Sequence, residues 1–285
     1  MKPIIVIGMH RSGTSMMVKI LENFGVFMGN DKEHNEESLF FIELNDWILN
    51  QSYASWDDPE NYKYLSDGAK ETLIPIIKNR LNSYHRKKYF GRKQPTSFFN
   101  YDLPWGWKDP RNTFTIDIWQ KIFGDVKIIH LHRNPLDVIA SLYKREKRQN
   151  KNIGNPTRTG IKKKLYGIRL PKKNLFLPIF RFSNYYGLFN LWKEYVSQSL
   201  SISDDSKKII HISYEELISN PQEIISELTA FLEIEPKNTL PKDFFNIKRK
   251  NAFLNNPELI AFYEKIKNDE LVKKLNYGNI GDNNG

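Results

Sequence analysis

Short runs of apolar and β-branched residues recur along the chain, separated by longer segments in which apolar residues recur every three or four positions. Three runs predict strands buried on both faces, at residues 4–7, 126–131 and 209–212. Residues 105–108 predict a fourth, shorter strand. Helical spacing appears at residues 15–24, 69–84 and 221–232. Strands that alternate with helices predict an α/β fold, with a mainly parallel sheet flanked by helices on both faces.

The length and composition fit one large domain. The 285 residues are 40% hydrophobic, which is enough for one sizeable core, so we expect a single domain over residues 1–285. The chain has no cysteine, which excludes disulfide bonds and thiolate metal sites. The first apolar run is too short for a signal-peptide core, and no stretch of about 18 apolar residues occurs. We therefore expect a soluble cytoplasmic protein.

The positive charge is concentrated in one segment. Residues 144–181 hold 13 Lys and Arg against one acid, Glu146, a local net charge of +12. Since the whole chain has a net charge of +10, the remainder carries about −2. Residues from about 149 to 174 are rich in Lys, Asn, Gly and Pro and predict a long loop or insertion. A solvated loop explains this segment, and the alternative is contact with an anionic acceptor or an anionic membrane surface.

A glycine-containing turn lies between the first predicted strand and the first predicted helix. It has the frame G-x-x-x-x-G, from Gly8 to Gly13, in which backbone N–H groups and a helix N-terminus face an anion. A loop that binds ATP or GTP has lysine at the next position, whereas this chain has Thr14 and carries its cation earlier, at Arg11. We expect these residues to bind an anion without a γ-phosphate: Arg11, Ser12, Gly13, Thr14 and Ser15.

A second basic motif follows the strand that ends at residue 131. Arg133 comes directly after this strand, and Pro135 suits the first turn of a new helix. Ser141 falls about two turns into that helix. At the carboxyl edge of a parallel sheet, Arg133 and Ser141 can reach the same ligand.

Together the two motifs resemble those of the sulfotransferases that use 3′-phosphoadenosine 5′-phosphosulfate (PAPS). Residues 11–15 are similar to the 5′-phosphosulfate loop of that family. An arginine followed eight residues later by a serine, as Arg133 and Ser141 are here, is similar to its 3′-phosphate site. Residues 213–217 with Asn220 and Pro221 resemble a strand–helix segment of the family that we interpret as structural.

The resemblance implies a fold and a reaction. The fold is like that of P-loop nucleotide kinases, with a parallel sheet of about five strands. The reaction is in-line transfer of the sulfuryl group of PAPS to an acceptor hydroxyl, without a metal, leaving 3′-phosphoadenosine 5′-phosphate (PAP). Fixed cations and backbone donors can stabilise the charge that spreads over the sulfuryl oxygens.

Candidate catalytic cations are Arg11, His10 and Lys108. Lys108 opens a Lys-Asp-Pro-Arg sequence that resembles the Lys-Asp-Pro element of tyrosylprotein sulfotransferases, whose lysine contributes to catalysis. Asp109 then has a structural role, as a cap or as the partner of a basic neighbour. A salt-bridged lysine at a strand end is the alternative for Lys108.

The general base is expected to be a carboxylate. No histidine follows Lys108, so the chain departs from the histidine motif of the cytosolic small-molecule enzymes. In the tyrosylprotein enzymes a Glu-Glu-Thr after the first helix carries the base on its second Glu, which corresponds to Glu37 here. Phe40 and Phe41 would raise the pKa of Glu37 by desolvation. The alternatives are His34 and a solvated acidic turn.

The acceptor suggested by these motifs is a carbohydrate hydroxyl, on a glycan or another anionic molecule. A lipid, a small metabolite or a tyrosine remains open. Five aromatic residues are numerous enough to line a ring-binding cleft and suit a core equally well: Trp47, Tyr53, Trp56, Trp105 and Trp107.

Three other functions remain open. The first is a P-loop kinase that uses ATP, against which the missing lysine and the Arg133–Ser141 pair both count. The second is a protein that binds a polyanion or a membrane through residues 144–181 without catalysis. We expect no nucleic acid, because that segment lacks the interleaved aromatics of single-strand binders. The third is a sulfotransferase that binds the nucleotide but has lost turnover.

Overall fold

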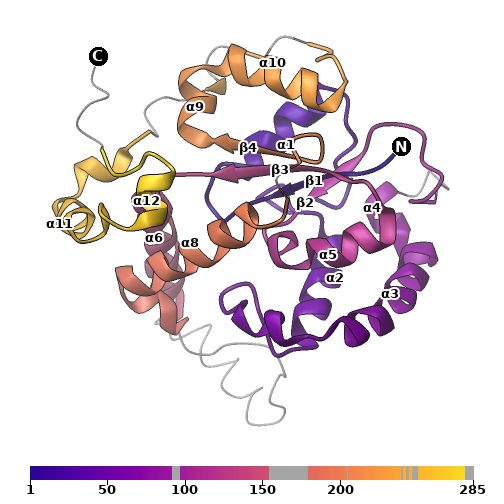
Figure 1. Ribbon diagram of the computed structural model, residues 1–285, viewed down its shortest axis with the longest axis horizontal. Helices are drawn as coiled ribbons and strands as arrows, with labels where there is room; N and C mark the ends of the chain where they lie inside the picture. The colour runs from indigo at the N-terminus through magenta and orange to yellow at the C-terminus, as the bar shows by residue number, and fades with distance from the viewer. Residues whose placement is uncertain are drawn as a thin grey trace. The chain divides into compact units, whose positions relative to one another are not determined.

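The computed structural model of the 285-residue chain describes residues 1–91, 97–153, 179–203, 205–238, 240–241, 244–245 and 250–279 (Figure 1). Internal contacts divide the chain into two compact units. Unit 1 comprises Met1–Asn134 and Glu194–Lys250, and unit 2 comprises Pro135–Lys193 and Asn251–Gly285. The expectation of one domain for the whole chain stays a prediction.

A parallel sheet lies in unit 1. Its strands are β1 (Ile4–Ile7), β2 (Gly106–Lys108), β3 (Lys127–His132) and β4 (Ile209–Ser213), in the order β2-β1-β3-β4. The register places Val6 between Lys108 on one side and Ile129 on the other. The four predicted strands are confirmed to within one residue at each end. Among the described residues the sheet has four strands, where the resemblance implied about five.

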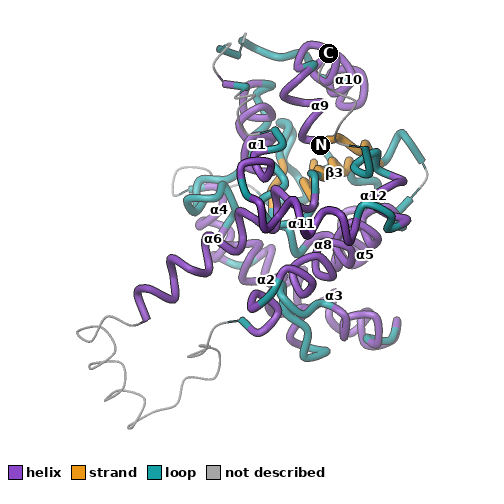
Figure 2. The backbone as a smooth tube through the Cα atoms, turned by 90° about the vertical axis from the view of Figure 1, so that its left-hand side faces the viewer, coloured by secondary structure: helices purple, strands orange, loops and turns teal. Residues whose placement is uncertain are grey.

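One face of the sheet is covered by α1 (Thr14–Asn23), α9 (Tyr214–Ser219) and α10 (Pro221–Leu232), as Figures 1 and 2 show. Apolar side chains from both layers form one buried cluster: Met17, Val18, Leu21 and Phe24 of α1, Leu228 of α10, and Ile129 and Ile212 of the strands. Pro221 begins α10 because its missing N–H and fixed φ suit a first helical position. The predicted helix at residues 221–232 is confirmed at both ends.

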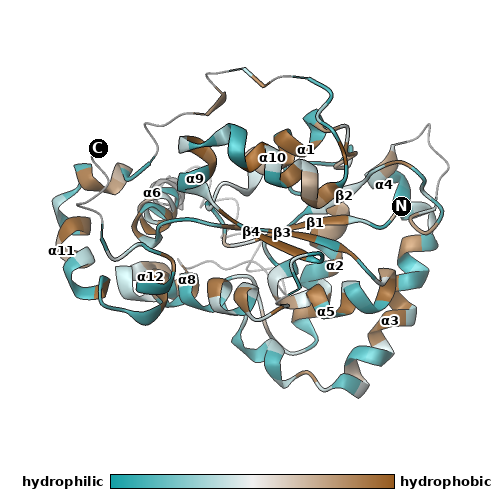
Figure 3. Ribbon diagram, turned by 45° about the horizontal axis from the view of Figure 1, so that its top comes forward, coloured by the Kyte–Doolittle hydropathy of each residue, from teal (hydrophilic) through white to brown (hydrophobic). Residues whose placement is uncertain are grey.

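The opposite face carries α2 (Leu39–Asn50), α3 (Asp67–Asn82), the short α4 (Lys87–Phe90) and α5 (Asn112–Phe123), with 3₁₀ turns at Glu60–Tyr64 and Tyr84–Arg86. Its core is aromatic. Phe41 of α2 stacks on Trp107 of β2 with ring centroids 3.8 Å apart, and Trp119 of α5 lies edge-on to both rings. Such aromatic pairs add to the hydrophobic burial of the strands, which Figure 3 shows as hydrophobic.

Unit 2 is helical in its described part. It contains α6 (Pro135–Ile153), a 3₁₀ turn at Phe180–Ser183, the start of α8 (Tyr185–Leu200), a second 3₁₀ turn at Ala252–Asn255, α11 (Pro257–Ile266) and α12 (Glu270–Lys274). Asp137 in the first turn of α6 accepts a hydrogen bond of 3.0 Å from the backbone N–H of Phe253. The rings of Tyr185 and Phe189 on α8 contact Phe262 of α11. These contacts join the two stretches of the chain that make up unit 2, Pro135–Lys193 and Asn251–Gly285.

Most of the basic segment falls outside the described residues. Residues 154–178 lie there, so the predicted loop and its contact with an anionic acceptor or membrane stay predictions. On the N-terminal side of these residues, α6 continues to Ile153, a few residues beyond the predicted start of the loop at about residue 149. Within the described ranges, no helix is both long and apolar enough to cross a membrane.

Candidate active site

The sheet order reverses direction between β1 and β3. The chain passes from β1 to β2 on one side of the sheet and from β3 to β4 on the other. In open α/β sheets, ligands bind at the carboxyl ends of the strands beside such a point. Gly8 follows β1 and Arg133 follows β3, so the two sequence motifs flank this point. Lys108 ends β2 at the same edge, because the strands are parallel.

The loop after β1 requires glycine at both ends. Gly8 has a φ of 127° and Gly13 a φ of 97°, a region that residues with a side chain rarely adopt. A Cβ on Gly13 would lie 2.3 Å from the ring of Tyr214, and one on Gly8 would lie 2.2 Å from the carbonyl oxygen of Leu131. The loop is therefore packed tightly against β3 and the start of α9.

The side chains of this loop divide into two groups. Ser12 is buried and donates a hydrogen bond of 2.7 Å to the carbonyl oxygen of Met9, so it shapes the loop itself. Thr14 is buried in the first turn of α1. Arg11, in contrast, is exposed and has a φ of 73°. Of the predicted loop residues, Arg11 is thus the one whose side chain is open to a ligand in solvent.

The start of α1 has the form of an anion site. Gly13 is its N-cap residue, and no described side chain caps the helix by a hydrogen bond. The N–H groups at a helix start have no partner within the helix, and they carry a partial positive charge. A bound phosphate or sulfate group would satisfy them.

Arg133 lies beside the loop. Its guanidinium carbon is 4.3 Å from the centroid of the Tyr214 ring, and its Nη1 donates to the carbonyl oxygen of Arg11 at 3.5 Å. Tyr214 therefore packs against both Gly13 and Arg133. The segment that follows β4 thus supports the glycine loop and the side chain of Arg133. Ser141 lies on α6 in unit 2, so its pairing with Arg133 stays a prediction.

Glu37 and Lys108 form a buried ion pair. The Nζ of Lys108 is 2.7 Å from Oε1 of Glu37, and the two residues are only 3% and 4% exposed. Lys108 also donates a hydrogen bond of 3.2 Å to the carbonyl oxygen of Asn35. The same oxygen accepts a hydrogen bond of 2.6 Å from Oγ of Ser15. The Asn35 carbonyl thus links the ion pair to the first turn of α1, just after the glycine loop.

The pKa of Glu37 lies above the ordinary value for a glutamate. Burial raises it most, because the charged carboxylate loses its water. The ammonium group of Lys108 acts in the opposite direction, and the carboxylate of Asp109 adds to the increase. One residue on, Ser38 caps α2 by accepting from the N–H of Phe41, which fixes the position of Glu37 just before that helix.

Arg111 joins this cluster, and the sequence motifs did not single it out for the site. Its Nη1 is 2.9 Å from Oδ1 of Asp109 and 3.8 Å from Oε2 of Glu37, and its Nε is 2.6 Å from Oδ1 of Asp46. Burial lowers the pKa of Arg111, but the acidic groups around it, led by Asp109 and Asp46, together raise it above the ordinary value, so the guanidinium keeps its charge. Asp109 is thus the ion-pair partner of a basic neighbour.

A buried amide holds α2 against α5 beneath the cluster. Asn45 donates to Oδ2 of Asp109 at 2.8 Å and to Oδ1 of Asn112 at 2.7 Å. Its own carbonyl oxygen accepts from Thr115 at 2.7 Å and from the indole of Trp119 at 2.9 Å. Because each polar atom of this amide is satisfied, it fixes the Lys-Asp-Pro-Arg segment relative to α2.

The remaining candidates lie in different environments. The imidazole Nδ1 of His10 is 3.8 Å from Oε1 of Glu37. The side chain of His34 is 83% exposed and lies beside Glu33, away from the buried ion pair. Among the predicted aromatics, Trp105 and Trp107 are fully buried in the core and Tyr53 is 91% exposed. Trp47 and Trp56 are partly exposed.

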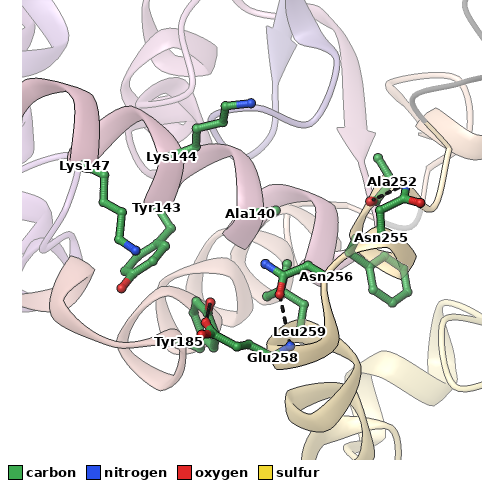
Figure 4. Close-up of a pocket in the computed structure, with 11 residues that line it drawn as sticks. Ala140, Tyr143, Lys144, Lys147, Tyr185, Ala252, Asn255, Asn256, Glu258 and Leu259 are labelled. Atoms are coloured by element: carbon green, nitrogen blue, oxygen red, sulfur yellow. Dashed lines mark hydrogen bonds between the residues drawn. The ribbon is translucent and has the colours of Figure 1, made fainter.

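Unit 2 has a cavity of its own, of about 460 Å³ (Figure 4). Lys144 and Lys147 of α6, the first two lysines of the basic segment with described side chains, contribute to its lining. Lys147 lies 4.5 Å from the ring centroid of Tyr143, and the hydroxyl of Tyr185 donates to Glu258 at 2.9 Å. The described start of the basic segment thus borders a cavity whose lining includes Tyr143 and Tyr185.

Comparison with protein families identifies the class of the chain. One family model, described as "Sulfotransferase family", matches residues 3–165, and a second, described as "Sulfotransferase domain", matches residues 109–281. Each covers more than half of the chain. The chain therefore belongs to the sulfotransferase family, and it is a transferase of sulfuryl groups. The predicted subtype, nearer to the tyrosylprotein and glycan enzymes, stays a prediction.

Solved structures with a similar arrangement are also sulfotransferases. A sulfotransferase from Alicyclobacillus acidocaldarius is 16% identical with a TM-score of 0.49, covering 94% of this chain and 90% of that one. A sulfotransferase domain from the curacin biosynthetic pathway is 18% identical with a TM-score of 0.43, covering 87% and 79%. STF9 from Mycobacterium avium is 16% identical with a TM-score of 0.42, covering 90% and 68%. No curated protein sequence matches this chain significantly.

Proposed function

We propose that this chain transfers the sulfuryl group of PAPS to an acceptor hydroxyl, with Glu37 as the general base and Lys108 and Arg11 as catalytic cations. The observation that carries the proposal is the buried ion pair between Glu37 and Lys108, which shares the Asn35 carbonyl with Ser15 in the first turn of α1, just after the glycine loop. A base, a cation and an anion-binding loop thus lie in one hydrogen-bonded cluster. Membership of the sulfotransferase family supports the same reaction.

The residues present fit a donor with anionic groups at two positions. The uncapped start of α1 and the exposed Arg11 suit a 5′-phosphosulfate, and Thr14 replaces the lysine that a γ-phosphate would need. Arg133, held over the Tyr214 ring beside the loop, suits a 3′-phosphate, with Ser141 as the second proposed contact. When bound, PAPS supplies a sulfuryl group already activated by its anhydride bond to phosphate.

The roles of the two buried side chains follow from their charges. Glu37 accepts the proton of the acceptor hydroxyl, and its raised pKa brings its basicity closer to neutral pH. Lys108 places a fixed positive charge where negative charge grows on the leaving oxygen, in surroundings with little water. Arg11 adds a second cation from the loop. Because these cations come from the protein, we propose that transfer proceeds without a metal.

The proposed donor can be tested by isothermal titration with PAP and, in parallel, with ADP. We expect PAP to bind more tightly than ADP, and Arg133→Ala to weaken PAP binding by about 10- to 100-fold, because a charge-assisted hydrogen bond contributes about 1.5–3 kcal/mol. The affinity for ADP should hardly change in this variant. Arg86→Ala, which removes a partly exposed arginine that donates to the carbonyl oxygens of Asn82 and Ser83, is the matched control.

Equal binding of ADP and PAP by the wild type would contradict the 3′-phosphate site. A requirement for Mg²⁺, together with tight binding of ATP, would favour the P-loop kinase instead. Binding of polyanions without binding of PAP would favour the non-catalytic alternative, and its affinity should then fall steeply with salt.

A further inference from the structure

Two series of side-chain contacts lead from the buried Glu37 to partly exposed residues. One runs from Glu37 to His10, whose Nδ1 is 3.8 Å from Oε1 of Glu37, and on to Trp56, whose ring centroid is 4.6 Å from that of His10. The other runs from Glu37 to Arg111 and on to Asp46. Both end on partly exposed side chains, since Trp56 is half-buried and the side chain of Asp46 is 42% exposed. If Glu37 is the base, both residues are near enough to contact an acceptor that approaches it.

Trp56 is held in place by a hydrogen bond to its backbone and by a ring contact with His10. The hydroxyl of Tyr195 donates a hydrogen bond of 2.7 Å to the carbonyl oxygen of Trp56, and Tyr195 is itself fully buried against Phe114. The ring of His10 lies edge-on to Trp56 at an interplanar angle of 68°. A fixed and partly exposed indole beside a base is a platform on which the apolar face of a sugar ring can stack.

The exposed charge beside Arg111 is the carboxylate of Asp46, whose side chain is 42% exposed. The buried guanidinium of Arg111 forms ion pairs with Asp46 and Asp109 and lies 3.8 Å from Oε2 of Glu37. Three carboxylates thus pair with two buried cations, Arg111 and Lys108, and of these three the carboxylate of Asp46 is the one exposed to solvent. An acceptor that places a carboxylate or sulfate beside Asp46 would be repelled by this exposed carboxylate.

We infer that Trp56 and Asp46 form the acceptor subsite and that it takes a neutral, ring-shaped polyol, such as an uncharged sugar residue, with the ring on Trp56 and a neighbouring hydroxyl donating to Asp46. The inference rests on the proposed function, because it assumes that Glu37 is the base. It narrows the acceptor from any glycan or anionic molecule to an uncharged ring. The basic segment at residues 144–181 plays no part in it.

The test uses matched acceptors with the full-length protein and PAPS. The first pair is methyl β-D-glucopyranoside and its uronide, in which a carboxylate replaces the C6 hydroxymethyl group. The second pair is methyl β-D-galactopyranoside and its uronide, and hexan-1-ol is the acceptor without a ring. Mass spectrometry of the sulfated product gives kcat and KM. We expect kcat/KM for a neutral glycoside to exceed that for its uronide by about tenfold or more, and Asp46→Asn to narrow this ratio.

Variants separate the subsite from the donor site. Trp56→Ala should raise the KM for the glycoside by about 3- to 10-fold, the effect of one aromatic stacking contact, while the Kd for PAP is unchanged. Trp56→Phe should restore most of the loss. The control is Tyr84→Ala, which removes an exposed aromatic ring that contacts its neighbour His85.

Preference for a uronide or for hexan-1-ol, or no sulfation of any panel member although PAP binds, would overturn the inference and leave the proposed donor intact. An unchanged KM in Trp56→Ala would overturn the role of Trp56. Failure of PAP to bind the wild type would instead overturn the proposed function itself.

Discussion

Glu37→Gln should lower kcat by about 10²- to 10⁴-fold while the Kd for PAP stays within about twofold of the wild-type value. The substitution keeps the size of the side chain and an oxygen for Lys108 to donate to, so the buried contact can persist. The amide cannot accept the proton of the acceptor hydroxyl, and removal of a general base costs a rate factor of this size. The measurement is steady-state kinetics with the fastest glycoside acceptor, beside titration of PAP.

Glu36→Gln is the matched control for this substitution. Glu36 is the adjacent carboxylate, but it pairs with Lys32 and lies outside the buried cluster, so kcat should hardly change. A kcat for Glu37→Gln above roughly a tenth of the wild-type value would contradict the role of Glu37 as base, given the expected size of general-base effects.

Lys108→Gln should lower kcat by about 10²- to 10³-fold, the effect of losing one preorganised charge beside a developing anion. It should also change the pH profile. The base must be ionised to act, so activity falls as the pH drops through the pKa of Glu37. Since the charge of Lys108 lowers that pKa, its removal lets burial raise the pKa further, and the acidic limb of kcat/KM should move to higher pH.

Lys88→Gln controls for the loss of a lysine elsewhere. Lys88 pairs with Glu43 at the surface of unit 1, and neither the rate nor the acidic limb should change. A fall in kcat for Lys108→Gln with an unmoved acidic limb would mean that a group other than Glu37 is the one that titrates.

The sequence predicted the elements whose signals are local. Continuous β-branched runs indicated β1, β3 and β4, and the glycine frame from Gly8 to Gly13 indicated the turn before α1. Pro221 marked the start of α10. In each case neighbouring residues determine the conformation, so pattern and propensity were sufficient. The sheet edge that gathers these motifs followed from the parallel arrangement alone.

The buried cluster around Glu37 could not be predicted in the same way. A Glu-Glu-Ser sequence before a helix also suits a solvated turn, and only tertiary packing buries Glu37 while leaving its neighbour Glu36 partly exposed. Arg111 and Asp46 are 65 residues apart along the chain, and their ion pair depends on how α2 packs against α5. Long-range pairs of this kind leave no periodic signal in a single sequence.

Two parts of the sequence-based site, Arg133 and the aromatic residues, also depend on tertiary packing. Arg133 was expected at the end of a strand, and the structure places it over Tyr214, a residue that the sequence marked only as structural. The aromatic residues were ambiguous between core and cleft. Trp105 and Trp107 are core, whereas Trp56 is partly exposed and lies next to His10. Exposure, which decides between the two roles, depends on the whole fold.

A crystal structure of the chain with PAP tests the central claim most directly, because it needs no knowledge of the acceptor. We predict the 5′-phosphate at the glycine loop and the start of α1, within hydrogen-bonding distance of Lys108, and the 3′-phosphate on Arg133 and Ser141. A PAP molecule bound away from the loop, or a 3′-phosphate that neither Arg133 nor Ser141 contacts, would contradict the account.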